Sequence, residues 1–384
     1  MDIPNILNHL GEEHESYFGA VAPPVIQSSN FCVKNVAELR NVLVNEFKTP
    51  FYTRGYNPIV GILRKKLAAL EGADDALVFG SGTAAIVAAV MSVVKANDHV
   101  VCVQKPYSWT NAFFNKYLVD YGVKTTMVDG RSVENIEKAI TPQTKLIYLE
   151  SPNSITFELQ DIEAVAKLAK KKGITTIIDN SYSSPLCQSP IAMGIDLVLH
   201  SASKYIGGHS DVVAGVVCGS KERIASMFAK EYMNLGAIIS PHDAWLMIRS
   251  LRTLELRVNK VAEVAPKVVD ALEDHPKIEK LNYPFSKNNL QLALAKKQMK
   301  CGTGLFSFQL KTDEQGIERF VNSLKRFLIA TSWGGHESLV FPFCAMPEAN
   351  RNMSNLPVNL VRMYVGIDEA DYLIKDIMQA LDKI

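Results

Sequence analysis

Short apolar runs alternate with stretches of helical periodicity through the middle of the chain. The runs predict seven strands, at 76–79, 99–103, 124–128, 145–150, 174–179, 196–200 and 213–218. A helix is expected after Asp161 and ends at Lys170-Lys171-Lys172-Gly173, where lysines suit the negative helix end and glycine suits a left-handed cap. Another helix is expected from Ser132. This alternation is typical of an α/β domain with a mostly parallel sheet buried on both faces.

The pattern changes at both ends of this region. About a dozen residues rich in Gly and Ser join the last two strands, too few for a helical crossover, so we expect an antiparallel edge strand there. After about residue 241 come long helices over 243–273 and further strands at 304–310, 330–335 and 360–365, which predict a smaller α+β domain. The expected division is an N-terminal arm at 1–50, the main α/β domain at 51–242 and a C-terminal domain at 243–384.

Composition narrows the class of protein. The 384 residues carry 41 Lys+Arg against 40 Asp+Glu, and the net charge of +1 argues against a nucleic-acid binder that relies on bulk electrostatics. The apolar stretch 77–94 is interrupted by Gly80-Ser81-Gly82-Thr83, so we expect no membrane span there. No basic segment followed by an apolar one opens the sequence, and the expected location is the cytoplasm.

The six cysteines form no CxxC pair, and most lie in apolar runs. We therefore expect buried, reduced thiols. The eight histidines are scattered without HxxxH spacing, so no metal site is expected.

The segment His200-Ser201-Ala202-Ser203-Lys204-Tyr205-Ile206-Gly207-Gly208-His209 contains the first candidate chemistry. A lysine at a strand end beside glycines can be shielded from water, which lowers its pKa and allows it to form a Schiff base. Ser201 and Ser203 are placed to donate hydrogen bonds to a phosphate. The alternative is a surface turn with a solvated lysine, and this segment alone does not separate the two.

Two further signals accompany that lysine. Gly80-Ser81-Gly82-Thr83 follows a strand and opens a helix, where backbone N–H groups can hold a phosphate, although a tight turn would have the same sequence. Asp179 ends a buried strand, where ligands of α/β sheets bind, although it could instead cap a helix. A lysine, a phosphate cradle and an acid together meet the requirements of pyridoxal phosphate.

At this point the chain resembles the family of pyridoxal-phosphate enzymes of cysteine and methionine metabolism, which includes cystathionine lyases, cystathionine γ-synthase and methionine γ-lyase. The resemblance runs from Pro23 to Gly366. Its longest motifs are Tyr52-Thr53-Arg54-Gly55-Tyr56-Asn57-Pro58, Glu71-Gly72-Ala73, the Gly80 turn, Glu150-Ser151-Pro152, Asp179-Asn180 and the segment from Ser201 to His209. It implies an aspartate-aminotransferase-type fold (fold type I), usually a homotetramer of two active dimers.

The resemblance also implies roles for single residues. Lys204 would hold the cofactor covalently and act as catalytic base, and Tyr107 would stack on the ring and assist catalysis. Asp179 would pair with the ring nitrogen. Phosphate contacts would come from Ser201, Ser203, Gly82 and Thr83, and from Tyr52 and Arg54 of the neighbouring subunit. Arg362 and Ser332, with Tyr52, would bind the substrate amino acid, whereas His200 and His209 are expected to be structural.

Within the family the motifs are mixed. Asn153-Ser154-Ile155 and the tryptophan of Thr331-Ser332-Trp333-Gly334-Gly335 look like bacterial cystathionine β-lyases. Arg54-Gly55-Tyr56-Asn57-Pro58 looks instead like γ-acting members. Trp109 stands where those members usually have a small residue; its indole would narrow the pocket or pack outward. The favoured reaction is β-elimination of cystathionine, with a γ-acting lyase, synthase or sulfhydrylase as the alternative. A non-catalytic regulator that binds the cofactor is the alternative of another class.

Overall fold

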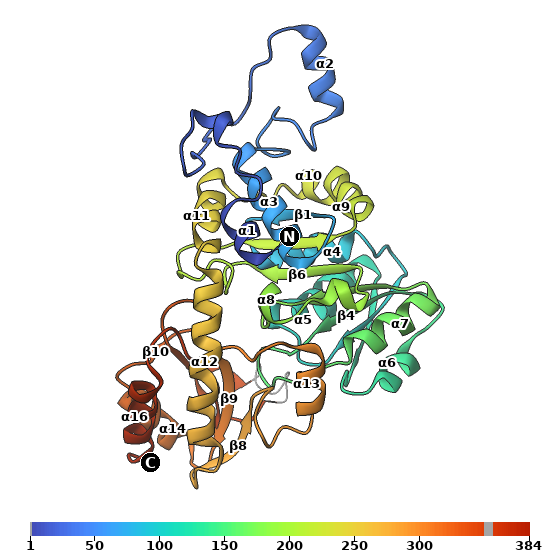
Figure 1. The fold of residues 1–384 in the computed structure, drawn as a ribbon. Helices are drawn as coiled ribbons and strands as arrows, with labels where there is room; N and C mark the ends of the chain where they lie inside the picture. The colour runs from blue at the N-terminus through green and yellow to red at the C-terminus, as the bar shows by residue number, and fades with distance from the viewer. Residues whose placement is uncertain (1, 349–355) are drawn as a thin grey trace.

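The strands form two sheets in residues 2–348 and 356–384, which the computed structural model describes (Figure 1). The larger sheet confirms all seven predicted strands to within two residues at each end. Its strand order is β1-β7-β6-β5-β4-β2-β3. The strands are β1 (Asp75–Phe79), β2 (His99–Val103), β3 (Lys124–Val128), β4 (Thr144–Glu150), β5 (Thr175–Asp179), β6 (Leu197–Ser201) and β7 (Gly215–Gly219).

The sheet is parallel except at β7, which runs antiparallel to both β6 and β1. The expected antiparallel direction is therefore confirmed, but the expected edge position is wrong. β7 is an inner strand because β1, from much earlier in the chain, pairs with its outer side. The short connection explains why β7 runs antiparallel beside β6. It does not indicate which distant strand pairs with the other side of β7.

Helices cover both faces of this sheet because successive side chains of each strand point in opposite directions. On β1, Ala76 and Val78 pack into the same core as α3 (Pro58–Glu71), while Leu77 and Phe79 pack with α4 (Gly82–Met91). The other helices of this part are α5 (Ser108–Ala112), η2 (Phe113–Tyr117), η3 (Leu118–Tyr121), α6 (Val133–Ala139), α7 (Ile162–Lys172), α8 (Ser184–Cys187), η4 (Pro190–Met193), α9 (Lys221–Met227), η5 (Phe228–Tyr232) and α10 (Met233–Leu235).

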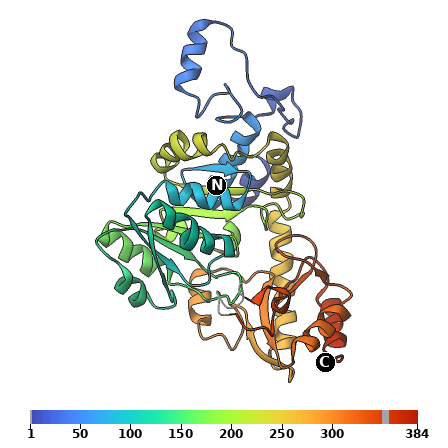
Figure 2. The ribbon, with the colours of Figure 1, turned by 180° about the vertical axis from the view of Figure 1, so that it is seen from behind.

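The first residues are tied to this core, and the segment after them extends away from it. α1 (Ile3–Asn8) rests on α3, where the buried Lys66 ammonium donates to the carbonyls of Ile6 and Leu7 at 3.0 and 3.1 Å. Beyond η1 (His14–Tyr17), α2 (Val36–Val44) projects from the molecule at the end opposite the C-terminal part, as Figures 1 and 2 both show.

The C-terminal part is built on the second sheet, with order β10-β11-β12-β9-β8. Its strands are β8 (Ile278–Asn282), β9 (Leu305–Leu310), β10 (Leu328–Ile329), β11 (Leu339–Pro342) and β12 (Leu360–Tyr364). Its helices, with the two that lead into it, are α11 (Pro241–Leu251), α12 (Leu254–Glu273), α13 (Leu292–Gln298), α14 (Glu314–Ser323), η6 (Phe343–Ala345) and α16 (Ala370–Leu381). The strand expected at 330–335 is wrong: pairing ends at Ile329, and the following residues form a loop.

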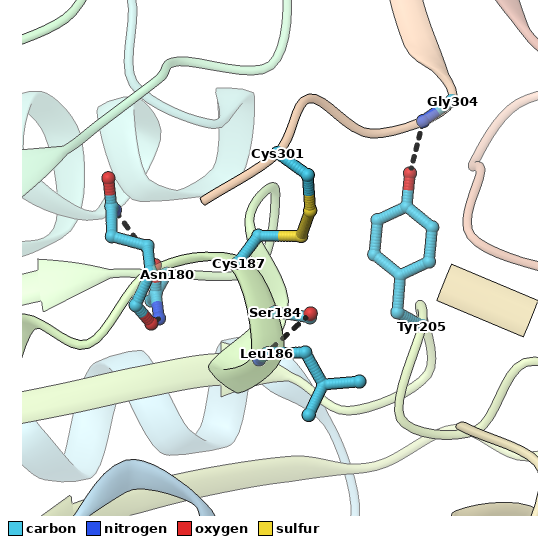
Figure 3. The surroundings of a disulfide bond; sticks show 8 residues. Asn180, Ser184, Leu186, Cys187, Tyr205, Cys301 and Gly304 are labelled. Carbon is cyan, nitrogen blue, oxygen red and sulfur yellow. Dashed lines mark hydrogen bonds between the residues drawn. A yellow bond between two sulfur atoms is a disulfide. The ribbon is translucent and has the colours of Figure 1, made fainter. Parts of the chain in front are cut away.

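A disulfide contradicts the expectation of reduced thiols for two of the six cysteines, whereas Cys102 and Cys218 are buried free thiols as expected and Cys32 is exposed. Cys187, at the end of α8, is bonded to Cys301, which follows α13, with Cα atoms 5.4 Å apart (Figure 3). The Lys300 N–H also donates to the Cys187 carbonyl at 2.7 Å. The two cysteines are 114 positions apart in sequence, so their pairing is visible only once both segments are packed together.

No helix in the described ranges has the length and apolarity that crossing a membrane requires.

Candidate active site

A cavity of about 670 Å³ lies at the carboxyl ends of the parallel strands, between the two sheets. It brings together most of the residues predicted from sequence. Those that line it are Gly82, Thr83, Tyr107, Asp179, Ser201, Ser203, Lys204, Ser332 and Arg362. Parallel strands end at one edge of a sheet, which is why residues over 100 positions apart meet here.

The start of α4 has the features of a phosphate cradle. The Ser81 hydroxyl caps the helix by accepting from the Ala84 N–H at 3.0 Å, which leaves the N–H groups of Gly82 and Thr83 in the first turn for a ligand. Position 82 requires glycine because a Cβ there would lie 2.9 Å from the Cβ of Ser201. Ser203 stands nearby, its hydroxyl accepting from the Ala214 N–H at 2.9 Å.

Asp179 is a buried acid aimed into this cavity. Its carboxylate accepts from the Ser181 N–H at 2.9 Å. Burial raises its pKa, and the hydrogen bonds from Ser181 and the charges of His200 and Lys204 oppose that rise. A cation brought next to Asp179 would hold it ionised, and a protonated pyridine nitrogen is such a cation.

Lys204 follows β6 and lines the same cavity as the first turn of α4. Its Nζ donates to the Ser332 hydroxyl at 2.8 Å and lies 5.6 Å from the centre of the Trp333 indole. Burial and the positive charge of Arg362 lower its pKa to about 8. A minor fraction of this amine is therefore neutral near physiological pH, and that neutral form is the one that a nucleophile or base requires.

Arg362 enters the cavity from β12 of the second sheet. Burial lowers its pKa to about 10, so the guanidinium remains charged at neutral pH. Its Nη1 donates to the Ser154 carbonyl at 3.3 Å. No carboxylate in residues 2–348 or 356–384 forms an ion pair with it, which leaves the guanidinium for an anionic ligand.

The donors and acceptors of this cavity fit pyridoxal phosphate. The helix start at Gly82 can hold the phosphate, Asp179 can pair with the ring nitrogen, and the Lys204 amine can bind the aldehyde. Tyr107, at the N-terminus of α5, faces the same space, and burial raises its pKa, so its hydroxyl keeps its proton at neutral pH. This arrangement is that of a fold type I pyridoxal-phosphate enzyme.

Two predicted residues lie outside the cavity. Arg54 rests over the ring of Tyr52, 5.2 Å from its centre, and neither lines the cavity of its own chain. Their assignment to the neighbouring subunit's phosphate stays a prediction. His200 and His209 are also outside: His200 contacts the buried Glu71, and His209 contacts Ser250 at 3.0 Å.

Sequence reasoning assigned no role to several residues at the cavity. Glu150 and Ser181 line it next to Asp179, and Trp333 lines it next to Ser332. Glu150 had a visible signal, because it ends a strand as Asp179 does. Trp109 lines the opening with 63% of its surface exposed, so its indole borders the pocket without being buried in the core.

Comparisons with known proteins agree with this geometry. The family model described as Cys/Met metabolism PLP-dependent enzyme matches residues 5–382. The chain is 37% identical over 384 residues to the L-methionine gamma-lyase of Treponema denticola, covering 98% of this chain and 96% of that one. It is 34% identical over 380 residues to the cystathionine beta-lyase of Lactococcus lactis subsp. cremoris, covering 98% and 97%.

A solved structure extends the comparison to the fold. The crystal structure of metB from Corynebacterium glutamicum superimposes with a TM-score of 0.94 at 34% identity, covering 100% of this chain and 98% of that one. The chain therefore belongs to the Cys/Met metabolism family of PLP-dependent enzymes, and its cofactor is pyridoxal phosphate. Relatives that cleave on the β and γ sides are similar to it to nearly the same degree.

Proposed function

We propose that this enzyme cleaves the Cβ–S bond of a thioether amino acid by β-elimination, with cystathionine as the first substrate to test. Cystathionine and water would give homocysteine, pyruvate and ammonia. The observation that carries the proposal is the position of the Lys204 amine, which is partly neutral and lies in one cavity with Arg362 and Asp179. A base, a carboxylate anchor and a ring acid are the minimum that this reaction requires.

Each residue has a task that follows from its contacts. Arg362 would bind the substrate α-carboxylate, and the Ser332 hydroxyl, 2.8 Å from Lys204 Nζ, would orient the amine. Lys204 Nζ would take the proton from Cα, and either Lys204 or the Tyr107 hydroxyl would supply a proton to the leaving sulfur. Bound pyridoxal phosphate supplies the electron sink for this chemistry, and Asp179 would keep its ring nitrogen protonated.

The motifs that resemble β-lyases support cleavage on the β side. Ser154 and Ile155 from one of these motifs, and Ser332 and Trp333 from the other, all line the cavity. The second candidate is γ-elimination or γ-replacement, and it is favoured by the 37% identity to a methionine gamma-lyase. A γ-acting enzyme needs an additional proton removal at Cβ, for which Lys204 would again be the base.

Identifying the keto acid released from cystathionine separates these candidates. Pyruvate would support β-elimination, and 2-oxobutyrate would support the γ-acting candidate. Lys204→Ala should abolish either product, whereas Lys221→Ala, which changes an exposed lysine on α9, should not. Release of no keto acid from any thioether amino acid by the yellow, cofactor-bound protein would favour the non-catalytic regulator.

We further propose that the enzyme is a cytoplasmic homotetramer made of two active dimers. The segment that projects around α2 exposes large apolar side chains, and a covering partner would explain them. They include Phe18, Val21, Val36, Leu43 and Val44. In such a dimer, Tyr52 and Arg54 would reach the phosphate bound by the partner, which accounts for their position outside their own cavity.

A further inference from the structure

Glu150 is a buried acid of the cavity for which the proposed reaction has not yet provided a task. It is the last residue of β4, with 4% of its surface exposed, and its Cα pairs with that of Asp179 on β5. Two carboxyl groups thus end neighbouring strands at the same edge of the sheet and face the same cavity.

The two oxygens of Glu150 are both occupied by backbone donors. Oε2 accepts from the Tyr107 N–H at 2.6 Å, and Oε1 accepts from the Ser154 N–H at 3.0 Å. Tyr107 belongs to the connection after β2, and Ser154 belongs to the connection after β4. One carboxylate therefore fastens two separate loops to each other and to the end of a central strand.

Each of these loops continues to a residue that the reaction uses. The Tyr107 hydroxyl interacts with the side chain of Thr83 at the phosphate cradle, so this tyrosine links the first loop to the start of α4. The Ser154 carbonyl accepts from Arg362 Nη1 at 3.3 Å. The same residue, Ser154, thus donates to Glu150 through its N–H and accepts from Arg362 through its carbonyl.

We propose that Glu150 is a positioning residue that sets the distance and angle between the cofactor ring at Tyr107 and the substrate carboxylate at Arg362. This inference rests on the proposed function, because it takes Tyr107 and Arg362 in the roles given above. Glu150 itself touches neither substrate nor reacting atoms, and it acts through the two backbone N–H groups that it holds.

The chemistry of the site explains why a carboxylate suits this task. Two inward N–H donors require two acceptors, which a carboxylate has; an amide offers one acceptor and one N–H, which would oppose a donor. Burial and the neighbouring Asp179 raise the pKa of Glu150, and the backbone N–H groups of Tyr107 and Ser154 oppose that rise because they stabilise the carboxylate. A carboxyl group whose pKa is raised by burial and by a neighbouring acid is typical of functional sites.

The test compares Glu150→Gln and Glu150→Asp with a matched control in the cofactor-bound enzyme. Glu263→Gln is the control, because it removes the same charge from an exposed position on α12. Glu263 pairs with Lys267 at 2.7 Å and does not line the cavity. The measurements are kcat and KM for keto-acid release, the absorption spectrum of the bound cofactor, and the spectral titration with glycine, which has the carboxylate but no leaving group.

If the two loops move, both cofactor binding at Tyr107 and substrate binding at Arg362 should change. Glu150→Gln is expected to lower kcat/KM by about 10²-fold, as a displacement of about 1 Å can do, with kcat reduced and KM raised together. The glycine dissociation constant should rise, and the cofactor spectrum should shift. Glu150→Asp, whose shorter side chain reaches one N–H, should fall between wild type and Glu150→Gln. Glu263→Gln should stay within about threefold of wild type on the same scale.

The opposite results would overturn the proposal. These are kcat/KM and glycine affinity of Glu150→Gln within about threefold of wild type, or equal losses in Glu150→Gln and Glu263→Gln. If Glu150→Gln fails to fold, Glu150→Asp decides: wild-type kinetics and spectrum would overturn the proposal, and a joint change in kcat, KM and spectrum would support it. A wild-type enzyme that releases no keto acid would refute the proposed function, while the glycine titration would still decide the role of Glu150.

Discussion

Removal of the Arg362 side chain is the most direct test of how this cavity binds its substrate. The guanidinium is buried against Phe341, with its carbon 5.7 Å from the ring centre, and it donates to the Ser154 carbonyl. It remains charged at neutral pH, since burial lowers its pKa only to about 10. An amino-acid carboxylate would supply the negative charge that the described part of the chain does not provide.

The size of the effect follows from the kind of contact. Truncation of one partner of a desolvated, hydrogen-bonded charge pair costs about 2–5 kcal/mol. At about 1.4 kcal/mol per factor of ten, this corresponds to a loss of roughly 30- to 4,000-fold in kcat/KM. Arg362→Lys keeps the charge but not the planar pair of donors, so it should recover only part of that loss.

The assay is the rate of keto-acid release as a function of substrate concentration. Arg362→Ala should raise KM for every amino-acid substrate, and the matched control Arg326→Ala, which removes an arginine stacked 5.4 Å from Tyr372, should not. A substrate analogue in which an amide replaces the carboxylate provides the decisive comparison, because it has no anion to lose. An equal loss for the amide and for the parent amino acid would refute the assignment of Arg362 to the carboxylate.

Further predictions concern the cofactor, the assembly and the disulfide. Asp179→Asn should retain the cofactor yet lower kcat by several orders of magnitude, because the amide cannot hold the ring nitrogen protonated; near-normal kcat would contradict this. Mixing Arg54→Ala with Lys204→Ala subunits, each nearly inactive alone, should restore activity, up to about half of a normal dimer's activity in each mixed dimer, because one of its two sites is complete. Subunit exchange without recovery would exclude that sharing. The rate at which cofactor-free enzyme takes up pyridoxal phosphate should rise as the pH increases through about 8, where Lys204 loses its proton; a midpoint near an ordinary lysine would disprove the shift. Peptide mapping without reductant should recover Cys187 linked to Cys301. Reduction should lower Tm, because a bridge across 114 positions limits the conformations of the unfolded chain and so raises the free energy of unfolding by about 4–5 kcal/mol. Alkylation of both thiols in unreduced protein would count against the bridge.

Local patterns were sufficient for the elements that carry the site. Six of the seven strands of the large sheet are buried on both faces and form nearly continuous apolar runs, which locate them to within two residues. The edge strand β3 is largely exposed, and its Thr-rich sequence was still sufficient to locate it. The helix after Asp161 ends at Gly173 with φ of 66°, as its lysines and glycine indicate. The turn at Gly82 and the acid at Asp179 were visible for the same reason, since each lies directly at the end of a strand.

Other features depend on contacts between distant segments, which no local pattern contains. The inner position of β7 follows from its pairing with β1, and the Cys187–Cys301 bridge joins segments 114 positions apart. The loop at 330–335 has the apolar start of a strand but finds no partner beyond Ile329, and it instead brings Ser332 to Lys204.

The amino-acid sequence by itself indicated the class of fold, the cofactor and most of the residues that line the cavity. Lys204, Asp179 and the Gly82 turn were indicated by residue type at a strand end or helix start, and Tyr107, Ser332 and Arg362 by the resemblance to a known family. The tertiary structure decided which of these residues meet. It placed Arg362 of the second sheet beside Ser154 of the first domain, and it revealed that Glu150 holds Tyr107 and Ser154 together. The physical reason is that a hydrogen bond or an ion pair forms only between groups about 3 Å apart, and packing of the two sheets, rather than order along the chain, sets that distance.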